Sequence, residues 1–252
     1  MKKNHKIIAI IGGMGSASSL FLHEKILSTA VLTKKMESDG DYPDVIHLSL
    51  PSGIPDRSEF LLDKSSSNPA LIIHDFLTGL ERMAEVLHRE MIVVVACNTF
   101  HAPPIWDVLK KVNQEKPHQK LEILHFVNIV AEEYAGKFHE KKLGILSTSG
   151  ERKFGIYKNI LEEYGITCVQ TDDEAQENLQ RCIYNIKKNP TPQPDDLRII
   201  HDILKDFLSQ EANNVILGCT ELSMIKANIT WQGGLVDPIE IISKKLIRMS
   251  EG

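Results

Sequence analysis

Residues 93–99 (VVVACNT) and 214–220 (NVILGCT) follow the same plan. Each is an apolar, largely β-branched run, which is typical of a strand buried on both faces. Each then ends in a small residue, a cysteine and, within two positions, a threonine. The two cysteines, Cys97 and Cys219, stand roughly half a chain length apart in 252 residues. This repetition predicts two α/β halves of similar plan, each with a cysteine at the end of a buried strand.

The alternation of strand-like and helix-like segments extends along the whole chain. Strands are expected at residues 6–11, 45–50, 91–96, 121–126, 142–147, 166–170 and 215–218. A helix is expected to begin at Pro69, capped by Asn68, with an apolar face of Ala70, Ile73, Leu77, Leu80, Ala84 and Leu87. A second helix is expected after the proline-rich residues 190–194, facing inward with Leu197, Ile200, Leu204 and Phe207. This order predicts an α/β fold with mainly parallel sheets covered by helices on both faces.

The composition limits the class of partner. Hydrophobic residues make up 42% and charged residues 25%, as in an ordinary globular protein. The formal net charge of −5 offers no general basic face, so neither nucleic acid nor a membrane is expected as a partner. The basic residues 1–6 precede an apolar run too short for a signal peptide or a membrane span, which predicts a cytoplasmic protein.

The four cysteines show no CxxC pair and no zinc-ligand spacing, so free thiols and no metal site are expected. Cys168 and Cys182 lack the strand-end context, and we interpret both as structural. Cys97 and Cys219 each precede a turn into a helix, whose free N–H groups lower a thiol pKa from about 8.5 toward neutrality. The alternative for each cysteine alone is a small buried hydrophobe. The repetition of the arrangement favours a functional pair.

Two thiols on opposite sides of a cleft suit one reaction in particular. Inversion of a stereocentre with a weakly acidic C–H needs a base on one face and an acid on the other. The intermediate carbanion needs fixed donors for its carboxylate. Asn98, Thr99 and Thr220 are placed to supply them, although each alone is also typical of a cap or turn.

With these residues identified, the chain resembles the aspartate racemase branch of the Asp/Glu racemase superfamily. The matching segments, in order, are residues 11–15 (IGGMG), 54–57 (IPDR), 97–101 (CNTFH), 146–150 (LSTSG), 218–221 (GCTE) and 236–238 (VDP). The resemblance implies two Rossmann-like lobes, residues 1–115 and 116–236, related by a pseudo-two-fold axis with the active site in the cleft between them. It also implies that the helix at 237–252 packs back on the first lobe. It further implies a two-base mechanism without pyridoxal phosphate or any other cofactor, a small amino-acid substrate and a homodimer.

The resemblance also assigns roles by position. Cys97 and Cys219 match the catalytic thiols, and Asn98, Thr99 and Thr220 match the groups that hold the α-carboxylate and amino group. Arg57, Thr148 and Ser149 match the pocket for the side-chain carboxylate. Lys188, or Lys187 with a shift of one residue, matches a lysine for the same carboxylate, and Met14 joins the substrate-binding set. Without the motifs, Arg57 would be read as a solvated loop cation paired with Asp56 or Glu59, and Lys188 as a surface lysine.

Two departures from the family pattern bear on these assignments. Ser16 stands where the family usually has proline, and we expect its side chain to cap the following helix. Residues 50–53 form a segment one residue longer than usual beside the side-chain pocket. Glu221 follows Thr220 where glutamate racemases resemble a Cys-Thr-His pattern, so aspartate is the expected substrate. Because the longer segment helps to shape the pocket, glutamate or a broader range of amino acids is left open.

Three other functions remain as alternatives. A dinucleotide-binding enzyme is disfavoured because Ser18 occupies the third glycine position after Gly13 and Gly15, and no ribose-binding acid ends the second strand. A non-catalytic solute-binding protein would share the two-lobed plan but give the thiols no role. A decarboxylase or cis–trans isomerase on the same fold often alters one thiol, whereas both are present here.

Overall fold

The computed structural model describes residues 5–63, 67–136 and 142–251. The chain divides into two compact units. The first unit comprises Met1–Phe126 and Ile239–Gly252, and the second comprises Val127–Pro238. Each unit is built on its own four-stranded parallel sheet.

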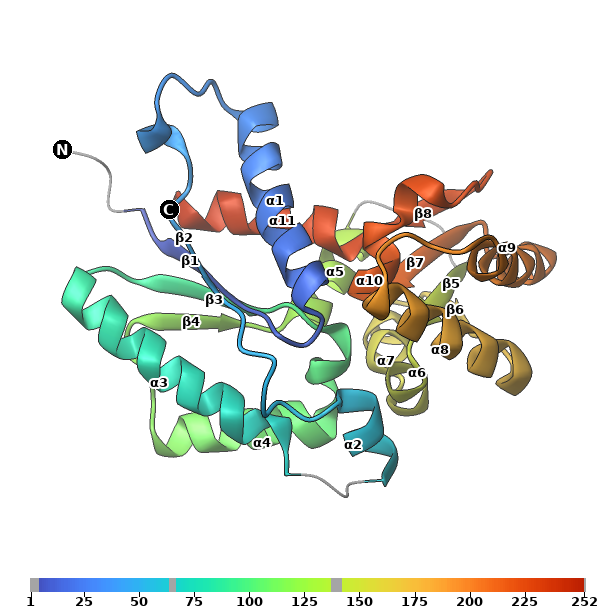
Figure 1. Ribbon diagram of the computed structural model, residues 1–252, viewed down its shortest axis with the longest axis horizontal. Helices are drawn as coiled ribbons and strands as arrows, with labels where there is room; N and C mark the ends of the chain where they lie inside the picture. Colours follow the sequence, from blue (N-terminus) through green and yellow to red (C-terminus); the bar gives the residue numbers. More distant parts are fainter. Residues whose placement is uncertain (1–4, 64–66, 137–141, 252) are drawn as a thin grey trace. The chain divides into compact units, whose positions relative to one another are not determined.

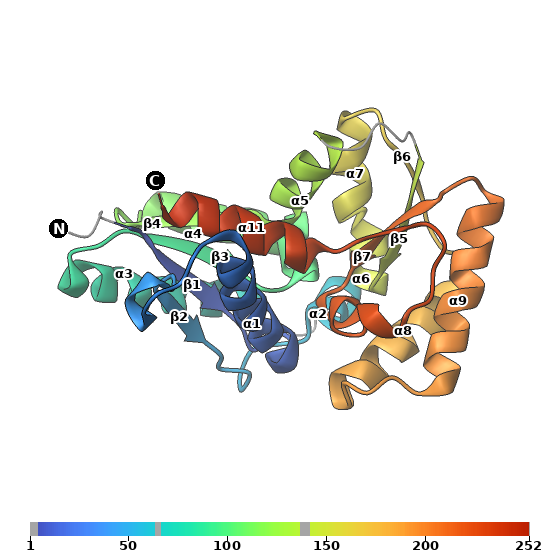
Figure 2. The same cartoon turned by 90° about the horizontal axis from the view of Figure 1, so that it is seen from above.

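The sheet of the first unit has the order β2-β1-β3-β4. Its strands are β1 (Ile7–Ile11), β2 (Val45–Leu48), β3 (Met91–Val95) and β4 (Leu121–Leu124). Its helical segments are α1 (Ser16–Thr33), η1 (Asp39–Asp41), α2 (Arg57–Asp63), α3 (Pro69–Leu87), η2 (Asn98–His101), α4 (Pro103–Glu115) and α11 (Pro238–Ser250). Helices α1 and α11 lie on one side of the sheet and α3 and α4 on the other (Figures 1 and 2). Every residue of the inner strands β1 and β3 is buried, as expected for strands with helices on both faces.

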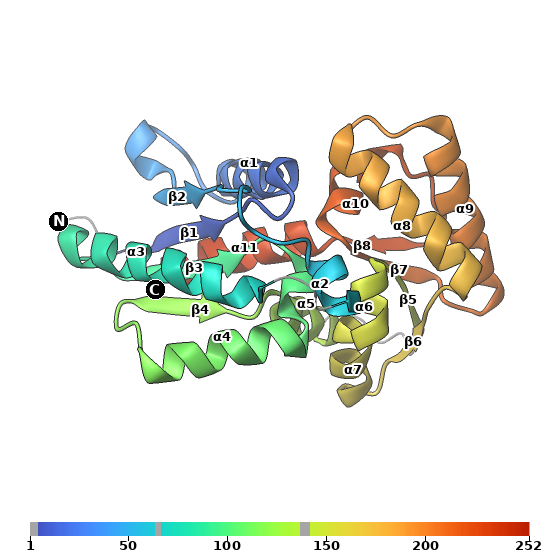
Figure 3. The same ribbon diagram turned by 60° about the horizontal axis from the view of Figure 1, so that its bottom comes forward.

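The sheet of the second unit has the order β6-β5-β7-β8. Its strands are β5 (Lys142–Ser147), β6 (Thr167–Val169), β7 (Asn214–Gly218) and β8 (Gly234–Val236). Its helical segments are α5 (Phe126–Ala135), α6 (Ser149–Phe154), α7 (Ile156–Glu163), α8 (Asp173–Lys188), α9 (Pro194–Ser209), α10 (Thr220–Met224) and η3 (Lys226–Asn228). Helices α8 and α9 lie on one side of the sheet and α6 and α7 on the other (Figure 3). Leu179, Ile183, Ile200 and Phe207 of α8 and α9 join the strands in one buried core.

The two sheets repeat one topology. Counted along the chain within each unit, the strand order is second, first, third, fourth in both. The first and third strands are therefore the central pair, and their carboxyl ends are neighbours: Ile11 is in register with Val95, and Ser147 with Gly218. Ligands of parallel α/β sheets bind at such carboxyl ends. The predicted α/β class with parallel sheets is confirmed.

Local sequence signals account for much of the element pattern. The side chain of Asn68 accepts from the backbone N–H of Ala70 at 2.9 Å, and Pro69 opens α3, as predicted. The prediction that Leu87 belongs to the buried face of α3 is wrong, because Leu87 lies in the last turn of the helix and is 47% exposed. The expected cap by Ser16 is also wrong, because Gly15 is the N-cap of α1 and makes no side-chain bond.

The predicted strand at 121–126 is shorter in the structure, because Phe126 already begins α5. Strand β4 pairs with β3 and so belongs to the first sheet. For this reason the units divide between Phe126 and Val127 rather than between residues 115 and 116. Strand β8, only three residues long, was not predicted.

Candidate active site

Cys97 lies at the carboxyl end of the central strand β3. Its backbone is extended, with φ −156° and ψ 113°, and it is the N-cap of the short helix η2. The side chains of Cys97, Asn98 and Thr99 are all buried. The carbonyl of Cys97 accepts from the backbone N–H of Phe100 at 3.2 Å and from the Nδ1 of His101 at 2.9 Å. The turn that carries the first candidate thiol is thus closed by its own hydrogen bonds.

Met14 and Arg57 are in direct contact in the first unit. The Nη2 of Arg57 donates to the carbonyl of Met14 at 2.9 Å, and its Nη1 donates to the carbonyl of Pro55 at 3.1 Å. Arg57 is only 6% exposed, so it is not the solvated loop cation of the alternative interpretation. Asp56 caps α2, since its Oδ1 accepts from the backbone N–H groups of Ser58 and Glu59 at 2.8 and 3.1 Å.

The loop that carries Met14 depends on glycine. Gly13 and Gly15 have φ of +86° and +120°, a region that side chains disfavour. A Cβ on Gly12 would lie 2.3 Å from the Oγ of Ser19, so this residue also allows α1 to approach β1 closely. The glycine-rich start of the chain therefore shapes the loop beside Arg57.

Cys219 occupies the equivalent position in the second unit. It follows β7, has an extended backbone with φ −136° and ψ 133°, and is the N-cap of α10. Its Sγ donates to the Oε2 of Glu221 at 2.9 Å, and the hydroxyl of Thr220 donates to the same oxygen at 3.2 Å. All three side chains are buried.

The electrostatics around Cys219 correct the expectation of a lowered thiol pKa. Burial raises the pKa of Cys219 well above its usual range, and the Glu221 carboxylate raises it further. Lys187 and the backbone N–H of Glu221 oppose this shift. Helix α10 has only five residues, so the field at its N-terminus is outweighed by burial and by the adjacent carboxylate. The resting state of Cys219 is the thiol.

The lysine of α8 that faces Cys219 is Lys187. Its positive charge lowers the pKa of the thiol, it is half-buried, and its Nζ lies 5.1 Å from the centroid of the Tyr184 ring. Lys188, the preferred sequence assignment, is exposed at the last position of α8. The structure thus brings Lys187, rather than Lys188, into the surroundings of Cys219.

Thr148 and Ser149 lie at the end of β5, next to the strand that precedes Cys219. The hydroxyl of Thr148 accepts from the backbone N–H of Glu151 at 3.2 Å and so caps α6. The backbone N–H of Ser149 donates to the side chain of Gln180 at 2.7 Å. Both residues therefore have structural contacts in addition to their predicted role in binding.

Three buried ionisable groups of the second unit were not predicted as site residues from the sequence: Glu151, Tyr157 and Asp237. Burial raises the pKa of Glu151, although hydrogen bonds from Ser147 and from the backbone of Tyr157 oppose the shift. Burial raises the pKa of Tyr157 well above its usual range, and negative charge at Glu151, Asp237 and Cys219 adds to this shift. The available signal is Glu151 three positions after Thr148, a spacing that is typical of a helix cap.

The two remaining cysteines, Cys168 and Cys182, also have raised thiol pKa values. Burial raises the pKa of Cys168 and of Cys182 to about 12. All four cysteines of the chain are free thiols. Among the described residues, no group of three or more His, Cys, Asp or Glu side chains is arranged to hold a metal ion. In the same part of the chain, no helix combines the length and apolarity needed to cross a bilayer.

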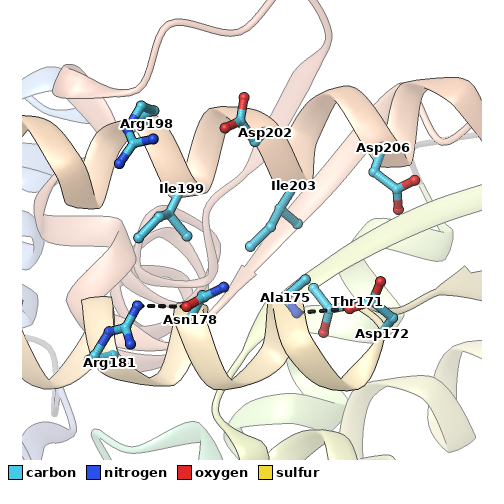
Figure 4. Close-up of a pocket in the computed structure, with 10 residues that line it drawn as sticks. All are labelled: Thr171, Asp172, Ala175, Asn178, Arg181, Arg198, Ile199, Asp202, Ile203 and Asp206. Carbon is cyan, nitrogen blue, oxygen red and sulfur yellow. Dashed lines mark hydrogen bonds between the residues drawn. The ribbon is translucent and has the colours of Figure 1, made fainter.

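A groove with a volume of about 530 Å³ lies between α8 and α9 (Figure 4). It is lined by Thr171, Asp172, Ala175, Asn178, Arg181, Arg198, Ile199, Asp202, Ile203 and Asp206. None of these is a predicted site residue. Some of its polar groups are bound to one another, since Arg181 donates to Asn178 at 2.6 Å and Asp172 accepts from the backbone of Ala175 at 2.8 Å. We therefore place the candidate site at the strand ends rather than in this groove.

The chain is similar to known proteins along nearly its whole length. The Asp/Glu/hydantoin racemase family matches residues 11–246. The broad-specificity amino-acid racemase RacX of Bacillus subtilis is 24% identical over 246 residues, 96% of either chain. Aspartate racemase of Picrophilus torridus is 25% identical, with a TM-score of 0.76 over 97% of this chain and 94% of that one. An aspartate racemase homologue of Pyrococcus horikoshii is 24% identical, with a TM-score of 0.73 over 98% of this chain and 100% of that one. The chain therefore belongs to the Asp/Glu/hydantoin racemase family and is an amino-acid racemase.

Proposed function

We propose that this protein interconverts L- and D-aspartate without a cofactor, with Cys97 and Cys219 as the acid–base pair. The observation that carries the proposal is the repeated topology. In each unit, the candidate thiol follows the third strand of a sheet with the same strand order and caps the next helical turn. Two equivalent thiols are what a reaction needs when its two directions are mirror images.

The proposed chemistry transfers one proton on each face of the α-carbon. A Cys97 thiolate takes the α-proton and becomes a thiol, and the electron pair of the C–H bond stays on the α-carbon. The Cys219 thiol gives its proton to the opposite face and becomes a thiolate. The reverse reaction exchanges the two roles. The raised pKa of Cys219 and its hydrogen bond to Glu221 support its starting role as the acid.

The proposed substrate carries a side-chain carboxylate, and the candidate site has two cations for it. Arg57 is buried and held in a fixed orientation by the carbonyls of Met14 and Pro55, which suits a planar fork that binds a carboxylate. Lys187 supplies a second positive charge beside Cys219. Asn98, Thr99 and Thr220, next to the thiols, are proposed to hold the α-carboxylate and amino group, and Thr148 and Ser149 to line the side-chain pocket.

A broader range of amino acids is the second candidate. It is supported by the Bacillus subtilis relative, a broad-specificity amino-acid racemase matched over 96% of either chain. One methylene changes discrimination by only about 1–3 kcal/mol, so glutamate belongs to this candidate. We further propose that the protein works as a cytoplasmic homodimer, on the strength of the sequence and the family resemblance.

The test is a chiral assay of all proteinogenic amino acids with the purified protein and no added cofactor. We expect aspartate to racemise fastest, and the Cys97→Ala and Cys219→Ala variants to lose the activity. Normal turnover in either variant would eliminate the two-thiol mechanism. Ligand binding without turnover, little changed after both thiols are alkylated, would instead support a solute-binding protein.

A further inference from the structure

His101 stands directly behind the Cys97 turn and has no role in the chemistry above. It is the last residue of η2 and is 1% exposed. Its Nδ1 lies 2.9 Å from the carbonyl oxygen of Cys97. A carbonyl can only accept, so Nδ1 carries the hydrogen in this contact. His101 is therefore a donor to the backbone of the candidate catalytic residue.

The ring of His101 is held in place by other rings. Its centroid lies 4.9 Å from that of Trp106 and 4.7 Å from that of His125, and Trp106 and His125 are 4.7 Å apart. Phe100 and Phe126, both fully buried, lie 5.7 and 6.1 Å from His101. Such packing leaves the imidazole one orientation, with Nδ1 toward the turn.

The same surroundings keep His101 uncharged. Burial lowers the pKa of His101 well below its usual range, and the neighbouring His125 lowers it further. Backbone carbonyls of Cys97, Asn98 and Leu124 oppose this shift. Burial also lowers the pKa of His125 to about 4, although a hydrogen bond to the backbone of His101 opposes this shift. Both rings are thus neutral at physiological pH, and the hydrogen bond to Cys97 does not depend on protonation.

The contact constrains more than one atom, because a peptide unit is planar. The carbonyl of Cys97 and the N–H of Asn98 belong to the same trans peptide and point in opposite directions. A donor that fixes the carbonyl therefore fixes this plane. It thereby restrains the ψ angle of Cys97, the residue whose Cβ carries the Sγ.

We propose that His101 is the positioning residue for Cys97, with Trp106 and His125 holding its ring so that one hydrogen bond to the backbone aims the thiol. That this orientation aligns the thiol with an α-proton rests on the proposed function. The hydrogen bond and its effect on the position of Cys97 do not rest on it.

The experiment compares two amides at one position. His101→Asn places an N–H donor where Nδ1 stood, whereas His101→Gln places its donor at the position of Nε2, away from the Cys97 carbonyl. His74→Gln is the matched control, a buried histidine of α3 in the same unit. The first readout is the rate at which iodoacetamide alkylates Cys97, divided by the rate at Cys219 in the same sample, measured by peptide mass spectrometry.

We expect His101→Gln to change this ratio by about five-fold or more, the scale of one buried hydrogen bond. His101→Asn should stay within about two-fold of wild type, and His74→Gln should not change the ratio. An unchanged ratio in His101→Gln, or the same change in His101→Asn or His74→Gln, would overturn the proposal. This readout needs no racemase activity, so it judges the proposal even if the chiral assay fails.

The second readout is the kinetics of aspartate racemisation in the same variants. Misplacement of a reacting group lowers kcat by about ten- to a hundred-fold, so His101→Gln should lose kcat with a smaller change in KM. His101→Asn should recover most of it. A wild-type protein without racemase activity would contradict the proposed function alone. An active wild type with full kcat in His101→Gln would contradict the role of His101.

Discussion

The Sγ of Cys219 lies 2.9 Å from the Oε2 of Glu221, so a thiol and a carboxylate share a hydrogen bond at a strand end. The carboxylate also accepts from Thr220, which fixes its orientation toward the sulfur. Burial and this contact together raise the pKa of the thiol although Cys219 is at a helix N-terminus. Glu221 is the charged group that adds to the effect of burial.

Replacement of Glu221 by glutamine should make Cys219 more acidic. The Glu221→Gln variant loses the negative charge that raises the thiol pKa, so the thiolate should form at lower pH. The check is the pH dependence of iodoacetamide alkylation at Cys219, with Cys97 as the reference in the same protein. We expect the Cys219 profile to shift to lower pH and the Cys97 profile to stay in place. A Cys219 profile unchanged from wild type would show that Glu221 does not act on the thiol.

Lys187 and Lys188 form a natural pair for comparison, because they are adjacent but differ in surroundings. Lys187→Gln removes a charge that lowers the pKa of Cys219, so the alkylation profile of that thiol should move to higher pH. The kcat/KM for aspartate should fall by about ten-fold or more, as for the loss of a charged hydrogen bond. Lys188→Gln, at an exposed position, should stay within about two-fold of wild type. Equal effects of the two substitutions would refute the assignment.

Arg57 is predicted to select substrates by their side-chain carboxylate. Arg57→Gln should lower kcat/KM for aspartate by about ten- to a hundred-fold, the value of a charge-assisted bidentate contact. The loss for alanine, which has no side-chain carboxylate, should be much smaller. Both are measured by chiral chromatography, with melting temperature as the control for the lost bonds to Met14 and Pro55. A similar loss for both substrates would assign Arg57 to the loop structure alone.

Glu151 gives a prediction about stability and pH. Because its pKa is raised in the folded protein, the folded state binds this proton more tightly than the unfolded chain. The stability that the neutral carboxyl contributes is complete below the unfolded value near 4.5 and is lost as the pH rises through the folded pKa. Glu151→Gln keeps an acceptor for the Tyr157 N–H and cannot ionise. Its melting temperature should therefore fall less than that of wild type between acid and neutral pH, by about 2–4 °C per kcal/mol.

The matched control for this measurement is Glu177→Gln, at an exposed position of α8. It should follow the wild-type curve across the same pH range. A Glu151→Gln curve parallel to wild type would mean that ionisation of Glu151 carries no cost in the folded protein.

The sequence was sufficient for features that depend on local pattern. The apolar runs before Cys97 and Cys219 predicted β3 and β7, one strand of the central pair in each sheet. The Asn68–Pro69 signal predicted the start of α3. These features could be predicted because burial on both faces and helix capping each determine the residue types at a few neighbouring positions.

Features that depend on pairing between distant segments could not be read. Strand β4 belongs to the first sheet only because it pairs with β3. Strand β8 has only three residues, the first of them Gly234, and is too short to form an apolar run. The contact between Cys219 and Glu221 depends on the extended backbone at the helix cap, since residues two apart do not face each other within a helix. Lys187 could have been predicted from the sequence. It follows the buried Ile183 by four positions on α8, and residues four apart lie on the same face of a helix.

The central claim is that one thiol acts on each face of the α-carbon, and the most direct test is the fate of the α-hydrogen in D₂O. L-Aspartate is incubated in D₂O with wild-type protein and sampled at low conversion. The two enantiomers are separated, and the deuterium content of each is measured by mass spectrometry. Two bases predict deuterium at the α-carbon of nearly all newly formed D-aspartate and almost none in the remaining L-aspartate, because a solvent-exchanged thiol supplies the new hydrogen. D-Aspartate that retains the original protium, or equal deuterium in both enantiomers, would contradict the two-thiol account.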